Sequence, residues 1–78
     1  MNNHRRKRIR DVIAQLEALH ADLQDLHEQE QNAHDNLPDS LQEAPKGAAS
    51  AQAAEALETA SDELGTIIDA LQEVADAS

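Results

Sequence analysis

The sequence predicts an all-α fold, an antiparallel two-helix coiled-coil hairpin that assembles into a homo-oligomeric helical bundle. Apolar residues recur with heptad spacing in two segments, and a linker with prolines and a glycine separates these segments. The 78 residues include no cysteine and no aromatic residue, so the core consists of Leu, Ile, Val and Ala. A chain this short buries only about 60% of its surface when it folds alone. We therefore expect one unit, residues 1–78, that is completed by association.

The first helix is expected over about residues 4–35. Its apolar residues step alternately by three and four, with Ile9 at position a and Val12 at position d of the heptad. Glu30 occupies a later a position, where a carboxylate costs stability. It either sets the register or marks the point where the seam opens.

The second helix is expected over about residues 48–76, with an alanine-rich first half and larger apolar residues in its second half. The turn between the helices spans about residues 36–47. Pro38 cannot continue the first helix, although it can begin a short helical turn, and Pro45 with Gly47 predicts a second break. Two helices of similar length joined by a short turn pack antiparallel.

The apolar a and d positions form the predicted oligomer seam, which residues at the neighbouring e positions widen. A seam this broad suits three or four helices better than two. We therefore predict a homodimeric four-helix bundle or a larger assembly, and a lone, partly molten hairpin is the alternative. The seam residues are Ile9, Val12, Ile13, Leu16, Leu19, Leu23, Leu26, Leu57, Leu64, Ile67, Ile68, Leu71 and Val74.

Five of the six basic side chains lie within residues 1–10, a segment that we call the basic head. Cations at a helix N-terminus oppose the helix dipole by roughly 0.3–1 kcal/mol each. Three interpretations are open: pairing with Asp69, Glu73 and Asp76 across the hairpin, a small-anion site, or a nucleic-acid-binding arm. The acidic remainder of the chain would repel a long polyanion. The predicted anion site consists of His4, Arg5, Arg6, Arg8 and Arg10.

Three histidines, His20, His27 and His34, recur every seven residues at e positions. This step separates them by roughly 10.5 Å along the axis, so they cannot chelate one metal from one helix. We predict no metal and no cofactor, and we expect the rings to cover the edge of the seam. A metal shared between helices, with a carboxylate as a further ligand, is the alternative.

An acidic stripe at the outer f positions of the second helix consists of Glu55, Asp62, Asp69 and Asp76. It predicts a solvated face, or otherwise a surface that imitates nucleic-acid phosphates. We find no nucleophile beside a base and no glycine-rich phosphate loop, so we do not expect an enzyme. No apolar run has the length of a membrane span, and no apolar signal region follows the basic head. A soluble cytoplasmic protein is expected.

The turn sequence Asn36-Leu37-Pro38-Asp39-Ser40-Leu41-Gln42 resembles a turn in an uncharacterised family of small helical-hairpin proteins from bacteriophages and prophages. The resemblance also covers the basic start and the two helices, but the family often continues with an acidic-Arg-Gly segment where this chain has Glu43-Ala44-Pro45-Lys46-Gly47. It implies a protein of the infected bacterial cell. By analogy of architecture, it implies a counter-defence sponge that holds nucleotide signals between protomers.

The function expected first is therefore non-catalytic sequestration of a small phosphate-bearing nucleotide at arginine-lined sites between protomers. The second expectation is an acidic protein-protein inhibitor or adaptor that docks on a basic host protein, in one version as a nucleic-acid mimic. The third is a purely structural coiled-coil component. Neither a membrane nor nucleic acid is expected as a partner.

Overall fold

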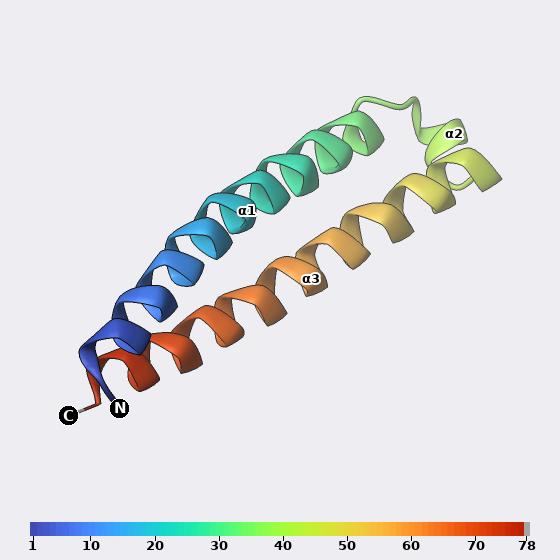
Figure 1. Ribbon diagram of the computed structural model, residues 1–78. Coiled ribbons are helices and arrows are strands. Elements are labelled where there is room, and N and C mark those ends of the chain that lie inside the picture. Colours follow the sequence, from blue (N-terminus) through green and yellow to red (C-terminus); the bar gives the residue numbers. More distant parts are fainter. Residues whose placement is uncertain (78) are drawn as a thin grey trace.

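The computed structural model describes residues 1–77, which form an elongated helical hairpin 58 Å long and 13–14 Å across (Figure 1). Helices α1 (Asn3–Asp35) and α3 (Pro45–Asp76) run antiparallel, and the short helix α2 (Asp39–Gln42) lies in the turn. The start of α1 and the end of α3 lie at the same end of the hairpin. The predicted all-α class is confirmed, with no strand in residues 1–77. Ser78, the last residue of the predicted unit, lies outside the described residues.

Both ends of α1 follow from local sequence. The Asn2 side chain caps the N-terminus by accepting a hydrogen bond from the backbone N–H of Arg5 at 2.8 Å. At the other end, Pro38 follows the last turn of α1 and precedes α2, because a proline can begin a helix but not continue one. The Gln42 side chain then donates a hydrogen bond to the carbonyl oxygen of Leu37 at 3.0 Å, which holds α2 against the end of α1.

Helix α3 begins at Pro45, three residues before the predicted start near residue 48. Pro45 occupies the first helical position, where its fixed φ suits the helix and its missing N–H needs no partner. Pro45 and Gly47 therefore belong to the helix and do not separate it from the turn. Gly47 is buried, and a Cβ at this position would overlap the carbonyl oxygens of Leu41 and Gln42.

The two glycines of α3 give a matched pair of predictions of opposite sign. Gly47→Ala is expected to lower the free energy of unfolding by about 1–3 kcal/mol, because α2 must move to admit the methyl group. Gly65→Ala is expected to raise it by up to about 1 kcal/mol, because its Cβ would lie an ordinary 3.5 Å from Nε2 of His20. Urea denaturation of both variants checks the pair, and equal signs would contradict it.

The interface between α1 and α3 uses the a and e positions of the heptad, whereas the sequence predicted a and d. Ile13 and Ile68, both at e, are each only 6% exposed and form the core with Ala75. The sequence placed these two isoleucines beside the seam. This expectation is corrected, because they lie at the centre of the interface between α1 and α3. Half-buried a-position residues complete this cluster, namely Ile9, Leu16, Leu64 and Leu71.

The sizes of the e-position residues explain this choice of interface. On α1, His20, His27 and His34 are half-buried at e positions within the interface, where the sequence had placed them at its edge. The small e-position residues of α3 let the backbones approach on that side and leave room for the rings. These small residues are Gly47, Ala54, Ser61 and Ala75, all buried.

Candidate functional site

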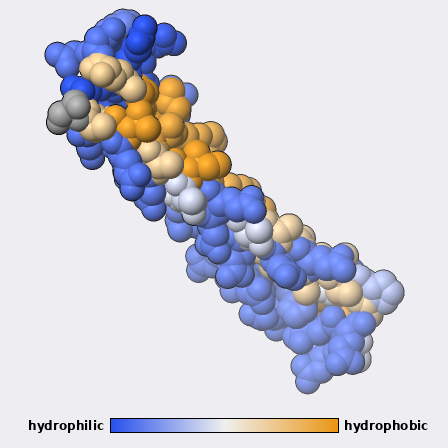
Figure 2. Space-filling model, turned by 90° about the horizontal axis from the view of Figure 1, so that it is seen from below, coloured by the Kyte–Doolittle hydropathy of each residue, from blue (hydrophilic) through white to orange (hydrophobic). Residues whose placement is uncertain are grey.

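The candidate functional surface is a row of large, exposed apolar side chains at the d positions of both long helices. Between 41% and 54% of each remains exposed: Val12, Leu19, Leu26, Ile67 and Val74. These residues were predicted to lie in the seam, and the hairpin by itself does not cover them. We call this surface, with the a-position residues behind it, the apolar face. Figure 2 shows hydrophobic side chains gathered in a strip that is widest near the termini.

The d positions of α1 and α3 lie on the same side of the hairpin. In each helix, position d is about 80° around the axis from the centre of the a/e interface. Because the helices run antiparallel, both rotations lead to the same side. The g positions flank this face, and on α3 three of these four are alanine: Ala49, Ala56 and Ala70. The apolar face is thus low in charge and smooth along α3.

A groove of about 290 Å³ lies at the end of the apolar face that carries the basic head. Arg5 and Arg8 line it together with the apolar side chains of Met1, Ile9 and Val12. We call it the basic groove. It combines two guanidinium groups, which suit forked contacts to phosphate or carboxylate, with an apolar wall.

A hollow of about 450 Å³ lies at the other end of the hairpin, beside the turn, and we call it the turn hollow. Within it, the Glu30 carboxylate accepts a hydrogen bond from the Ser50 hydroxyl at 2.8 Å. The sequence reasoning did not assign this site, although small residues at d and g positions around Glu30 were a signal for it. The residues that line it are Glu30, Ala33, Leu37, Lys46, Ala49 and Ser50.

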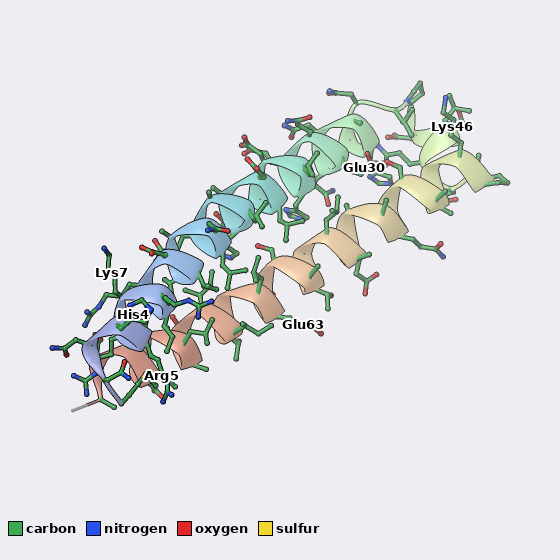
Figure 3. All side chains as sticks on the ribbon, in the orientation of Figure 1. His4, Arg5, Lys7, Glu30, Lys46 and Glu63 are labelled. Carbon is green, nitrogen blue, oxygen red and sulfur yellow. The ribbon has the colours of Figure 1, made fainter. Side chains whose placement is uncertain are left out.

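The structure separates the residues of the predicted anion site. Only Arg5 and Arg8 share the basic groove, whereas Arg10 lies near the C-terminal end of α3 and donates to the carbonyl oxygen of Ala75 at 3.3 Å. The Nε of the half-buried Arg6 has no hydrogen-bond acceptor among residues 1–77. Figure 3 shows Arg5 and Lys7 on different sides of α1, with His4 between their labels at the end of the hairpin.

The predicted pairing of the basic head with the acidic end of α3 is limited to one contact in residues 1–77. Arg10 and Asp76 approach to 4.0 Å, and both side chains are exposed, so this pair adds little stability. Within the same range, no acid lies within 4.0 Å of Arg5, Arg6, Lys7 or Arg8. Four cations near the positive end of the α1 dipole are therefore not neutralised by an ion pair inside the described hairpin.

The histidines and the acidic stripe make few contacts with other charged groups in the described part of the chain. Nε2 of His27 lies 3.7 Å from the Glu58 carboxylate, and Nδ1 of His34 lies 3.4 Å from Asp35. No group of three or more potential metal ligands comes together among residues 1–77. The acidic stripe at Glu55, Asp62, Asp69 and Asp76 is exposed on the outside of α3.

No helix within residues 1–77 combines the length and the apolar character needed to cross a membrane. Comparison with family models, with curated proteins and with solved structures gives no match to this chain.

Proposed function

We propose that this chain is a non-enzymatic association protein whose working form is a homodimeric four-helix bundle. The exposed d-position row carries the proposal. Burying the half-exposed part of one such side chain contributes about 1 kcal/mol, so ten of them in a dimer contribute about 10 kcal/mol. Association costs about 4–15 kcal/mol, so the contribution of this row is of the same size as that cost before the alanines and a-position residues are counted.

The charge of the apolar face supports a second copy as the partner. The chain carries a net charge of −10, so two copies repel each other in general. The apolar face and the g positions that flank it, however, hold three cations and three anions, so this surface as a whole is neutral. These residues are Arg5, Arg8, Asp22, Glu30, Lys46 and Glu63. Pairing through this face therefore keeps the excess acids on the outside.

The test of this proposal is the solution mass. Light scattering at micromolar concentration is expected to give twice the chain mass of 8.5 kDa. Added salt is expected to leave the mass unchanged or to raise it, because it screens the repulsion between the acidic outer faces. A mass of one chain at all accessible concentrations would remove the proposal.

The basic groove supports a second function, which competes with pairing of two copies at this groove: the capture of a small phosphate-bearing ligand such as a nucleotide. Arg5 and Arg8 line the groove side by side, and no acid lies within 4.0 Å of either in residues 1–77. Capture would be stoichiometric, since the site needs only to hold the anion. In the phage setting that the turn resemblance implies, such a protein would withdraw a nucleotide signal from the host.

Calorimetric titration with cyclic nucleotides, ADP-ribose-type nucleotides and inorganic phosphate tests this second function. We expect binding that is at least about tenfold weaker in the Arg5→Gln/Arg8→Gln variant, because each forked contact to phosphate is lost. Lys7→Gln is the control for each of the two single substitutions, since it removes one positive charge on a different side of α1. Absence of heat across the whole panel, or equal loss in the control, would contradict phosphate capture in the groove.

A further inference from the structure

We infer that the two copies pair head to turn, so that the basic groove of each lies against the turn hollow of the other. This inference rests on the homodimer proposed above and adds the arrangement of its partner. In this arrangement α1 packs antiparallel against α1 of the partner. In the alternative, head-to-head arrangement, α1 packs against α3 of the partner and the two basic heads meet.

The first argument is the symmetry of the d-position row. A two-fold axis beside Leu19 places this residue against its own copy and Val12 against the partner's Leu26. The register of the hairpin puts Ile67 of α3 close to the level of Leu19, so the same axis places Ile67 near its own copy and Val74 against the partner's Ala60. A large residue on the terminal side of the axis thus faces a small one on the turn side of the partner's α3, which keeps the spacing between the copies even on both sides of the axis.

The head-to-head arrangement lacks this match. The helix register is set by contacts such as that of Arg10 with Ala75 and of His27 with Glu58. It puts Leu19 close to the level of Ile67, so a partner related head to head would face large residues with large ones near the termini. Alanines would then face alanines near the turn, and the gap between the two copies would widen toward one end.

The second argument is charge. The same axis places Arg8 against the partner's Glu30, with Arg5 one turn away on the same face. Glu30 is half-buried and accepts a hydrogen bond from Ser50, but no cation lies within 4.0 Å of it in residues 1–77. Head-to-turn pairing joins this carboxylate to the arginines of the basic groove twice in each dimer. Head-to-head pairing would instead collect the arginines of both copies at one end.

Engineered cysteines test the arrangement directly, because the chain contains no cysteine of its own. We expect Leu19→Cys to form a disulfide-linked dimer under mild oxidation. Val12→Cys by itself should not cross-link, since its two copies would lie about 21 Å apart along the antiparallel helices. A mixture of Val12→Cys and Leu26→Cys should link as a heterodimer.

Two results separate this inference from the proposed function. If the native chain is a dimer, but Leu19→Cys fails to link while a mixture of Leu19→Cys and Ile67→Cys links, then the arrangement is head to head and only this inference fails. If the native chain is a monomer in light scattering, the proposed dimer fails as well.

Charge reversal tests the contact between Arg8 and Glu30. We expect Arg8→Glu and Glu30→Lys each to weaken dimerisation about tenfold, because two equivalent pairs are lost in each dimer. The double variant Arg8→Glu/Glu30→Lys is expected to regain native affinity, although the two positions lie far apart within one chain. Glu28→Lys, which makes the same change at an exposed outer position, is the matched control. Failure of the double variant to recover would overturn the pair.

Discussion

Leu19→Glu is expected to convert the proposed dimer into a monomer. Leu19 is 54% exposed in the hairpin, more than any other d-position residue of the apolar face, so the single chain tolerates a polar side chain there. In the head-to-turn dimer this residue lies beside the two-fold axis, so one substitution puts two carboxylates close together in an apolar interface. The expected loss is on the order of a hundredfold in dimer affinity. Sedimentation equilibrium measures it.

Ala18→Glu is the matched control, because it adds the same charge one residue away at an exposed outer position. It is expected to leave the dissociation constant within about threefold of the native value, through repulsion between the already acidic outer faces. If both variants weaken dimerisation equally, general repulsion is responsible and the apolar face is not the interface.

Ile68→Ala is expected to abolish the cooperative folding of the hairpin. Ile68 is 6% exposed and packs with Ile13 and Ala75 in the hydrophobic cluster that joins α1 to α3. Replacing a buried isoleucine with alanine costs about 2–5 kcal/mol, and a two-helix unit of this size has little stability to lose. Circular dichroism is expected to show low helix content at 25 °C and no sharp thermal transition.

The neighbouring substitution Ile67→Ala separates folding from association. Ile67 is 51% exposed, so the same change removes little packing within one hairpin and acts mainly on the dimer. Its loss of helix content on dilution should be recovered at higher protein concentration, because association and folding are linked. The loss in Ile68→Ala should persist at all concentrations. Equal behaviour of the two variants would show that the two faces are not distinct.

The sequence located the basic head but did not show which of its cations share a surface. Five cations within one and a half turns look like one cluster when only their order along the chain is known. The rotation of α1, which the packing of Ile13 fixes, sends Arg5 and Arg8 to the apolar face and brings Arg10 to the carbonyl oxygen of Ala75. The turn hollow escaped sequence analysis for a related reason, since its residues come from α1, the turn and α3.

The linker shows the same division between local and long-range information. Pro38 predicted the end of the first helix, because a proline ring excludes helical continuation whatever surrounds it. Pro45 and Gly47 were read as a second break, but they belong to α3. Only the path of α2 across Gly47 explains why a glycine is needed there.

Heptad periodicity, the prolines of the turn and the absence of aromatic residues determined by themselves that this chain is a hairpin of two long helices with more apolar surface than one hairpin covers. Three apolar stripes, at a, d and e, are nearly equal in the sequence. Only the tertiary structure decided that a and e meet inside the hairpin and that d stays outside. The reason is steric: small e-position residues such as Ala54 on α3 admit the isoleucine and histidine side chains of α1, and the helices rotate toward the side where their backbones approach most closely.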